Sequence, residues 1–593
     1  MILMLIILVK FFYFYDKVNI QKNYFYTVLY STLFVSVITL GLNLLSIKTG
    51  VALWAIIYYT ISIVMLIDVV YFKHFNQLTT VNLLVQIKHL STVGDSLLVL
   101  LDPSMLILIL DLIIIPFLPE KAIGFIIGGV DYKVVFFVFI IFFLEILYLN
   151  KTRIIKQDIV TYHGADLIGS LGKDAWELKK QVNPEDLNNY IYKTDENDRY
   201  FGSLKGSNLI IIQVEALQNF LLERDYKGIS IVPSVKRFSE DEHSIYFNNM
   251  YQIIGRGNTS DAEFATLTSI IPPRNALAYM EFQSRNYYSI PIQFKNMGYN
   301  TMIFHGNEKH YYNRHVIYPQ LGFNKYFGKE DYVFKEENKI GFGINDHDFL
   351  NQSLDKMLKE EKNGPIFAFI ITLSSHTPFN MPEKFSPKIA SSHDETNMVG
   401  RYINSINYAD WALGDFLNKM KETGLMERST VVLYGDHFAI SAANTEDTAA
   451  MVDAFDYKFG YSYDDMMNIP LIIHNKNLKR ETITNTCSQI DILPTLLNLY
   501  GVKESGGVVF GSDIINHPSN FCLPAGYMIE GSFFANDIFV MMDTTGDINE
   551  ARAFKIGTHA PQDAKQYEEL YKELMRKQTI SKYALFFNKM TKQ

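Results

Sequence analysis

Four of the five short apolar runs in the second half of the sequence end on residues that bind metal or handle protons. These residues are Glu215, His305, His376 and the Asp436–His437 pair. Ligand sites in open α/β sheets form at the carboxyl ends of the strands. A histidine at the end of a single strand is more often structural than functional, but four such endings in one sheet indicate a shared site.

Three of these residues have the chemistry of a metal site. Glu215, Asp436 and His437 together offer carboxylate oxygens and one imidazole. This donor set suits Mn²⁺, with Mg²⁺ and Zn²⁺ as alternatives. We therefore predict that the three residues hold a divalent cation.

The segment Gly255-Arg-Gly-Asn-Thr259-Ser-Asp-Ala-Glu263 supplies a candidate nucleophile. Its glycines and the residues after them predict a loop that enters a helix, with Thr259 at the helix N-terminus. Backbone N–H groups at such a terminus favour an anionic phosphate. A threonine hydroxyl is a poor nucleophile at its own pKa, but metal coordination deprotonates it. The segment therefore predicts metal-dependent phosphoryl transfer through Thr259.

The residues that follow Thr259 have a structural interpretation. Ser260 and Glu263 are spaced as in a capping box, in which each side chain bonds to a backbone N–H of the other residue. We interpret Ser260, Asp261 and Glu263 as helix-capping residues.

The elements that position these residues are predicted to be strands of one sheet. Continuous apolar, β-branched runs are typical of strands covered on both faces, and their alternation with helical stretches predicts a mostly parallel α/β sheet. The runs span residues 208–215, 301–305, 366–373, 430–437 and 469–474.

The first part of the sequence is far more apolar than the second. Residues 1–150 contain 8 Lys, no Arg and 8 acidic residues, so the net charge of −9 belongs to residues 151–593. Five stretches approach the roughly 20 apolar residues that span a membrane as a helix. They are Met1–Tyr15, Tyr24–Leu45, Val51–Phe72, Leu97–Leu118 and Val134–Leu149. A cleaved signal peptide does not fit the first stretch, because four more follow it.

Carboxylates interrupt the fourth stretch, at Asp102 and Asp111. A carboxylate inside a membrane is costly unless it faces protein or water. We interpret Asp111 as a polar contact inside the bundle. The whole chain of 593 residues is too long for one ordinary domain. We predict a transmembrane bundle at residues 1–150, a helical linker at 151–206 and a catalytic domain at 207–593.

Charge and cysteine content exclude other classes of protein. The acidic second part argues against nucleic acid as a partner, since binding phosphates requires a basic surface. The chain has two cysteines, Cys487 and Cys522, and no CxxC pair, which argues against a zinc or redox cysteine site. We expect both thiols to be unpaired.

The motifs in combination resemble the lipoteichoic acid synthase family. These are polyglycerolphosphate synthases of Gram-positive bacteria, with a sulfatase-like domain of the alkaline phosphatase superfamily. The resemblance extends over nearly the whole chain, from the apolar spans through the linker to the second domain. It rests on Glu215 after a strand, Gly-x-Gly-x-Thr259-Ser-Asp-x-Glu-Phe, His305-Gly, Tyr312-Asn-Arg314, Ser375-His376-x-Pro-Phe and Tyr434-Gly-Asp436-His437.

The resemblance implies specific roles. Glu215, Thr259, Asp436 and His437 match the family's Mn²⁺ ligands, and Thr259 matches the nucleophile. The residues that match those holding the glycerol-phosphate group are His305, Tyr312, Arg314 and His376. A guanidinium such as that of Arg314 grips phosphate through two donors, and a surface salt bridge is its alternative role. His376 has an alternative role as a proton donor.

The resemblance also implies the reaction and its location. Phosphatidylglycerol is the implied donor, and a glycolipid or polyglycerolphosphate chain is the implied acceptor. The enzyme is expected in the cell membrane as a multi-pass protein with its catalytic domain outside the cell. The sequence departs from the family at Tyr312, where Trp is usual, at Asn307, where Asp is frequent, and at Phe438-Ala439, where Tyr-Gly is usual.

Three alternative functions remain open from the sequence. A phosphoethanolamine transferase shares the Thr nucleophile and membrane bundle, but such enzymes commonly carry several disulfides. A sulfatase-like phosphodiesterase is a second alternative, although sulfatases mature a Cys or Ser in a Cys/Ser-x-Pro-x-Arg motif that Thr259-Ser-Asp does not match. A catalytically dead protein that binds teichoic acid is the third, and the four retained ligands argue against it.

Overall fold

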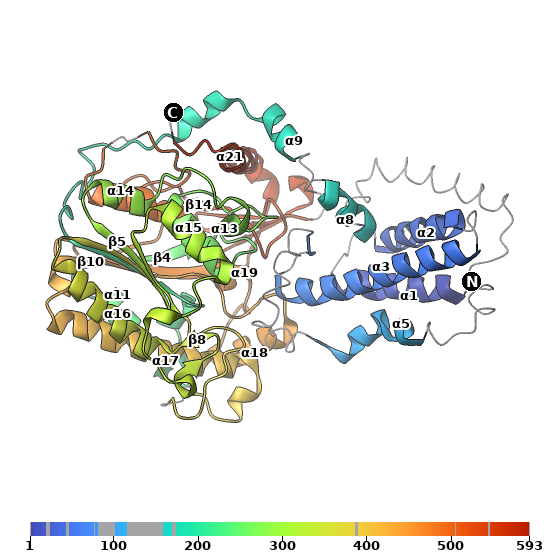
Figure 1. The fold of residues 1–593 in the computed structure, drawn as a ribbon, viewed down its shortest axis with the longest axis horizontal. Helices are drawn as coiled ribbons and strands as arrows, with labels where there is room; N and C mark the ends of the chain where they lie inside the picture. The colour runs from blue at the N-terminus through green and yellow to red at the C-terminus, as the bar shows by residue number, and fades with distance from the viewer. Residues whose placement is uncertain are drawn as a thin grey trace. The chain divides into compact units, whose positions relative to one another are not determined.

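The computed structural model describes ten segments of the chain, and it divides into two compact units, Met1–Asp174 and Ala175–Gln593 (Figure 1). The described segments are residues 2–18, 24–42, 47–75, 78–80, 101–114, 158–168, 174–385, 389–503, 506–543 and 546–591.

The first unit is built from apolar helices. They are α1 (Ile2–Lys17), α2 (Tyr24–Leu42), α3 (Ile47–Phe75), the 3-10 helix η2 (Pro103–Leu108), α5 (Leu110–Ile114) and α8 (Ile159–Ile168). Aromatic and aliphatic side chains of α1 and α3 form its core, including Phe11, Phe14, Tyr58 and Met65.

The described residues do not confirm the prediction of five membrane spans. Within the described residues, one stretch, Ala52–Lys73 of α3, has the length and composition to cross a membrane, and Tyr24–Thr39 of α2 forms a shorter apolar helix. The first predicted span corresponds to the 16 residues of α1. The fourth coincides in part with η2 and α5, and the fifth lies outside the described residues.

Buried polar contacts join the helices of the first unit. The Lys10 ammonium lies 2.7 Å from the Asp111 carboxylate and donates to Ser62 at 2.8 Å. Tyr58 donates to the same carboxylate. The interpretation of Asp111 as a polar contact inside the helical unit is therefore confirmed.

The second unit contains a nine-stranded sheet, and each of the five predicted runs forms one of its strands. The order is β12-β4-β11-β10-β1-β9-β5-β6, and β13 also pairs with β4. Strand β11 is antiparallel to β10 and β4, and the remaining pairs are parallel. The mostly parallel sheet is therefore confirmed. The bounds are β1 (Asn208–Val214), β4 (Ser244–Tyr251), β5 (Asn300–His305), β6 (Lys325–Phe327), β9 (Ile366–Ile371), β10 (Ser429–Gly435), β11 (Asn468–His474), β12 (Glu481–Ile483) and β13 (Cys487–Ser488).

Helices cover both faces of this sheet, which explains why its central strands are buried throughout. Every residue of β1, β9 and β10 is buried. In Figure 1, helices α11 (Pro233–Ser239), α16 (Asp346–Glu361) and α17 (Met398–Glu422) lie on one side of the sheet, and α14 (Ile290–Asn296) lies on the other. Helix α12 (Thr259–Thr268) packs against α20 (Ile492–Leu499) and α14.

A second sheet follows near the C-terminus and has its own core. Its five antiparallel strands are β14 (Phe521–Cys522), β15 (Phe533–Ala535), β16 (Ile538–Met541), β17 (Arg552–Lys555) and β18 (Pro561–Gln562), followed by α21 (Glu568–Phe586). Phe534 stacks on Tyr251 of β4, with ring centroids 4.3 Å apart. Cys487 and Cys522 are both buried and free, which confirms the prediction of unpaired thiols.

The other described α-helices and strands after residue 173 are short. They are α9 (Asp174–Gln181), α10 (Phe220–Glu223), α13 (Ala278–Glu281), α15 (Arg314–Leu321), α18 (Thr445–Phe455), α19 (Tyr463–Met467), the pair β2 (Asp225–Tyr226) and β3 (Ile229–Ser230), and the pair β7 (Lys339–Ile340) and β8 (Gly343–Ile344).

Candidate active site

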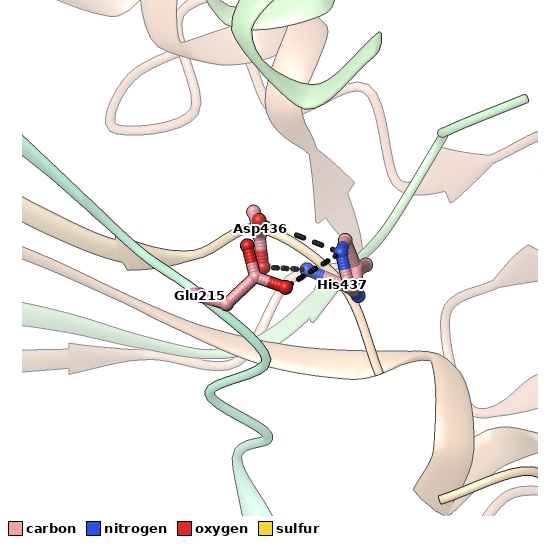
Figure 2. A group of neighbouring side chains, drawn as sticks. All are labelled: Glu215, Asp436 and His437. Atoms are coloured by element: carbon pink, nitrogen blue, oxygen red, sulfur yellow. Dashed lines mark hydrogen bonds and ion pairs between the residues drawn. The ribbon is translucent and has the colours of Figure 1, made fainter. Parts of the chain in front are cut away.

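Two carboxylates and an imidazole meet at the carboxyl ends of β1 and β10. These strands pair in parallel with Val214 opposite Gly435, so the next residues, Glu215 and Asp436, leave the sheet side by side. The ligand atoms of Glu215, Asp436 and His437 all lie within 4.8 Å of one another. The His437 Nε2 atom is 3.4 Å from Glu215 Oε1 and 3.6 Å from Asp436 Oδ2 (Figure 2).

Backbone hydrogen bonds fix the orientation of the two residues from β10. Asp436 Oδ1 accepts the N–H groups of Ala216 at 2.8 Å and of His437 at 2.7 Å. The His437 Nδ1 atom lies 2.8 Å from the carbonyl of Phe438 and donates to it in the Nδ1–H tautomer. In that tautomer Nε2 carries a lone pair that faces the carboxylates, as a metal ligand requires.

The residues present fit a divalent cation. Glu215 Oε1 and Asp436 Oδ2 are buried, and neither accepts a hydrogen bond from any described residue. Burial raises the pKa of both carboxyl groups, and the neighbouring Asp436 charge raises the pKa of Glu215 further. Buried carboxylates without partners are costly, and a cation between them removes that cost.

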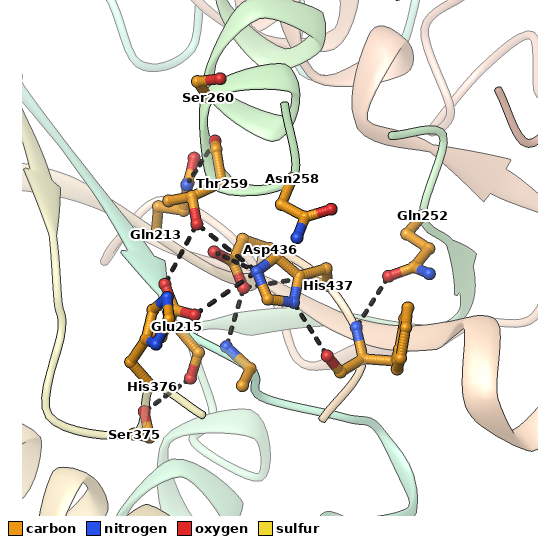
Figure 3. Close-up of polar contacts among 12 residues, drawn as sticks. Gln213, Glu215, Gln252, Asn258, Thr259, Ser260, Ser375, His376, Asp436 and His437 are labelled. Atoms are coloured by element: carbon orange, nitrogen blue, oxygen red, sulfur yellow. Dashed lines mark hydrogen bonds and ion pairs between the residues drawn. The ribbon is translucent and has the colours of Figure 1, made fainter. Parts of the chain in front are cut away.

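Thr259 is the first residue of α12 and lies against this ligand set. Its Oγ1 donates to Glu215 Oε2 at 3.2 Å and lies 3.4 Å from His437 Nε2 (Figure 3). Its carbonyl accepts a bond from the Gln213 side chain at 3.2 Å. Tyr434 donates to the oxygen of the same Gln213 amide, so strands β1 and β10 also hold the backbone of Thr259.

The capping interpretation of the residues after Thr259 is wrong. Asn258 is the N-cap residue of α12, and Asp261 accepts the N–H groups of Gly255 at 3.0 Å and Gly257 at 2.9 Å. The Asp261 carboxylate therefore closes the glycine loop, and its burial raises its pKa to about 7. A Cβ at Gly257 would lie 2.5 Å from Asp261 Oδ1, which explains the glycine.

Glu263, the other residue assigned to capping, forms a buried ion pair with Arg314. Its Oε1 accepts Arg314 Nη2 at 2.5 Å and Nε at 3.2 Å, and its Oε2 accepts the Tyr318 hydroxyl at 2.7 Å. Both charged side chains are at most 1% exposed. One turn of helix separates Glu263 from Thr259, so Glu263 lies too far into α12 to reach the N-cap N–H.

Of the remaining predicted residues, His305 and Tyr312 lie near Arg314, and His376 lies beside Glu215 in Figure 3. His305 is buried at the end of β5. Its burial lowers its pKa, and the positive charge of Arg314 lowers it further. The ring of Tyr312 lies 5.6 Å from the Arg314 guanidinium. His376 also acts on His305 electrostatically, and its ring packs on Phe342 at 4.5 Å. The charge of Arg314 lowers the pKa of Glu215, against the larger raising effects of burial and of Asp436.

Two residues of the site were missed from the sequence. Gln213 had a signal, because it is a polar amide that follows four consecutive aliphatic residues of β1. Tyr527, whose hydroxyl donates to Asn258, had none, because it lies in an irregular segment far along the chain.

Family models match both parts of the chain. The model of the lipoteichoic acid synthase N-terminal domain matches residues 1–159, and the sulfatase model matches residues 207–502. Lipoteichoic acid synthase 2 of Bacillus subtilis (strain 168) is 28% identical over 489 residues, which cover 79% of this chain and 75% of the relative. Lipoteichoic acid synthase 1 of the same strain is 31% identical over 389 residues, which cover 64% of this chain and 60% of the relative.

Solved structures show the same fold for the second unit. The lipoteichoic acid synthase LtaP from Listeria monocytogenes superposes with a TM-score of 0.63 and 28% identity, covering 69% of this chain and 99% of that structure. A protein in the alkaline phosphatase superfamily from Vibrio parahaemolyticus superposes with a TM-score of 0.54 at 19% identity, covering 66% and 89%, which shows the fold alone.

Proposed function

The chain belongs to the sulfatase-like lipoteichoic acid synthase family, and we propose that it is a metal-dependent phosphoglycerol transferase that builds polyglycerolphosphate from phosphatidylglycerol. One observation supports this most. Thr259 Oγ1 lies within hydrogen-bonding distance of both Glu215 and His437. These two residues and Asp436 form the candidate cation site. A hydroxyl in that position is a nucleophile that a bound cation activates.

The metal site supplies the electrophilic part of the chemistry. We assign Glu215, Thr259, Asp436 and His437 as its ligands, with Mn²⁺ as the ion. A cation bound there lowers the pKa of the Thr259 hydroxyl and neutralises charge on the phosphoryl oxygens.

The chain's own residues carry out the transfer in two half-reactions. In the first, Thr259 Oγ1 attacks the phosphorus of phosphatidylglycerol, and the bond to the diacylglycerol oxygen breaks. The Thr259 proton passes toward Glu215 Oε2, which already accepts it, and His376 protonates the departing diacylglycerol. In the second, an acceptor hydroxyl attacks the phosphorus of the glycerophospho-threonine ester and loses its proton to His376. The bond from phosphorus to Thr259 Oγ1 breaks, and Thr259 Oγ1 takes back its proton from Glu215.

Arg314, His305 and Tyr312 would hold the glycerol-phosphate group. The ion pair with Glu263 uses Nε and Nη2 of Arg314, and its remaining Nη1 is available to a phosphate oxygen. The Glu263 pair therefore fixes the guanidinium while leaving one nitrogen for substrate.

The family assignment makes this a membrane-anchored enzyme. In our proposal, residues 1–150 form a multi-pass bundle, residues 151–206 form a helical linker, and residues 207–593 act outside the cell. Donor and acceptor are both lipid-linked, so an anchored domain meets both at the bilayer surface. The acceptor in our proposal is a glycolipid or its growing polyglycerolphosphate chain.

The test follows release of diacylglycerol from fluorescent phosphatidylglycerol by the purified full chain with Mn²⁺. We expect release that EDTA abolishes, that Thr259→Ala abolishes and that Thr259→Ser partly retains, because serine keeps the hydroxyl. Phosphatidylethanolamine is tested in parallel. Release from phosphatidylethanolamine alone would favour phosphoethanolamine transfer, and full activity of Thr259→Ala would refute the assigned nucleophile.

A further inference from the structure

The side chain of Asn258 lies beside the nucleophile, but it does not cap the helix. Asparagine is favoured at N-cap positions because its oxygen accepts a helix N–H. Asn258 is the N-cap residue of α12, yet its side chain makes no such bond. Its Oδ1 instead accepts a hydrogen bond from Tyr527. With Oδ1 held, the amide nitrogen faces the other way, and Figure 3 shows it turned toward His437.

Tyr527 is itself held rigidly. Its side chain is 2% exposed, and its ring packs edge-on against Phe438 at 4.6 Å. The carbonyl of the same Phe438 accepts the His437 Nδ1 bond. Three hydrogen bonds hold the segment around Tyr527. The Gly526 N–H donates to the Ile254 carbonyl at 2.8 Å. The Arg274 guanidinium donates to the carbonyls of Ala525 at 2.8 Å and Met528 at 2.7 Å.

These contacts connect the metal ligand to the residue that precedes the nucleophile. The connection runs from His437 through Phe438 and Tyr527 to Asn258, which is covalently bound to Thr259. Tyr527 also lies beyond residues 207–502, the part of the chain that the sulfatase model matches. The C-terminal segment therefore contributes to a site whose other residues lie within residues 207–502.

We propose that Asn258 is a catalytic residue, whose amide N–H donates to a phosphoryl oxygen of the group that Thr259 attacks, and that Tyr527 is the positioning residue that orients this amide. The inference rests on the proposed function, since it requires phosphoryl transfer through Thr259. A fixed, neutral donor at that point stabilises charge that develops on the phosphoryl oxygens in the transition state.

The backbone of Asn258 offers a simpler explanation that an experiment must separate. Its φ is +44°, in a region that favours glycine and that asparagine tolerates better than most residues. Glycine at this position keeps the backbone conformation and removes only the amide. Aspartate keeps an acceptor for the Tyr527 hydroxyl and removes the N–H donor.

The experiment measures turnover of phosphatidylglycerol and of bis(p-nitrophenyl) phosphate by the full chain with Mn²⁺. The variants are Asn258→Gly, Asn258→Asp, Tyr527→Phe and the double variant Asn258→Gly/Tyr527→Phe. We expect both Asn258 variants to lose about 100-fold or more in kcat, which is the effect of removing one transition-state donor. We expect Tyr527→Phe to lose roughly tenfold in kcat with KM and the Mn²⁺ midpoint unchanged.

The double variant separates positioning from a general structural role. If Tyr527 acts through the Asn258 amide, Tyr527→Phe has no further effect in the Asn258→Gly background. A loss that persists there would overturn the role of Tyr527, and wild-type kcat in Asn258→Gly would overturn the role of Asn258.

The two substrates distinguish failure of the inference from failure of the proposed function. If Thr259-dependent cleavage of the synthetic diester occurs without turnover of phosphatidylglycerol, phosphatidylglycerol is not the donor. A loss of about 100-fold in kcat for that diester in Asn258→Gly would still support the inference. A wild-type chain that cleaves neither substrate would overturn both.

Discussion

Replacing Asp436 with asparagine should stabilise the metal-free protein and abolish its response to Mn²⁺. Asp436 Oδ1 accepts two backbone N–H groups, and an asparagine oxygen would keep both bonds. The new amide nitrogen would take the place of Oδ2, which no described residue contacts by a hydrogen bond, and would face Glu215. The substitution therefore removes one of two like charges and supplies a donor to the other.

The magnitude follows from the geometry. The ligand atoms of Glu215 and Asp436 lie within 4.8 Å of each other. At an effective dielectric constant of about 20, two full charges at that distance repel by roughly 3.5 kcal/mol. The metal-free Asp436→Asn variant should gain up to about this much at alkaline pH, where both carboxyl groups of the wild type are ionised. Wild type should gain about 2.7 kcal/mol from Mn²⁺ at 100 times its Kd, and the variant should gain nothing.

The assay is unfolding of the full chain by heat or denaturant in EDTA and in Mn²⁺. Asp410→Asn is the matched control, since it neutralises another buried carboxylate that accepts backbone N–H groups, on α17. The control should keep the full Mn²⁺ response. A metal-free Asp436→Asn variant less stable than wild type, or one that Mn²⁺ still stabilises, would refute the assignment of Asp436 as a ligand.

Three further predictions concern two buried carboxyl groups and the glycine loop before Thr259. Glu263→Gln should destabilise the chain by about 3–5 kcal/mol, because it leaves the Arg314 charge buried and unpaired. In denaturant unfolding, the double variant Glu263→Gln/Arg314→Met should recover most of that lost stability. Equal stability of the single and double variants would contradict this. Burial raises the pKa of Asp410 to about 6. The protonated carboxyl group therefore contributes to the free energy of unfolding below about pH 4, and this contribution is lost as pH rises through about 6. The difference in unfolding free energy between wild type and Asp410→Asn should change over that window by about 3 kcal/mol, and a constant difference would argue against the shift. Gly257→Ala should lower kcat by about 100-fold and leave the Mn²⁺ midpoint unchanged. The alanine Cβ would displace Asp261 and, with it, the loop that precedes Thr259. Unchanged turnover would show that the loop adapts.

The sequence predicted the central sheet because burial on both faces leaves a local trace. Runs such as residues 208–214 and 366–371 are apolar without alternation, and this pattern depends only on neighbouring residues. The polar residues at the ends of those runs can also be recognised from their neighbours alone, because each directly follows an apolar stretch. Glu215, Asp436 and His437 could therefore be grouped by their positions at strand ends, and their ligand atoms do lie within 4.8 Å of one another.

Glu263, which the sequence misassigned, and Tyr527, which it missed, both act over long distances along the chain. Ser260 and Glu263 have the spacing of a local cap, but the partner of Glu263 is Arg314, 51 residues away. Tyr527 is 269 residues from Asn258. No spacing rule covers such pairs, because the packing of separate elements decides them.

The parallel pairing of β1 with β10 determines when the metal site comes into existence. Asp436 is held by the N–H of Ala216 from a position 220 residues later in the chain. During synthesis the N-terminal strand therefore emerges long before its partner, and contacts of such large sequence separation form late in folding. A cation that needs both Glu215 and Asp436 binds only after these strands have paired. Metal loading would report that the sheet has already closed in the correct register, so an enzyme that has acquired its cation is one that has finished folding.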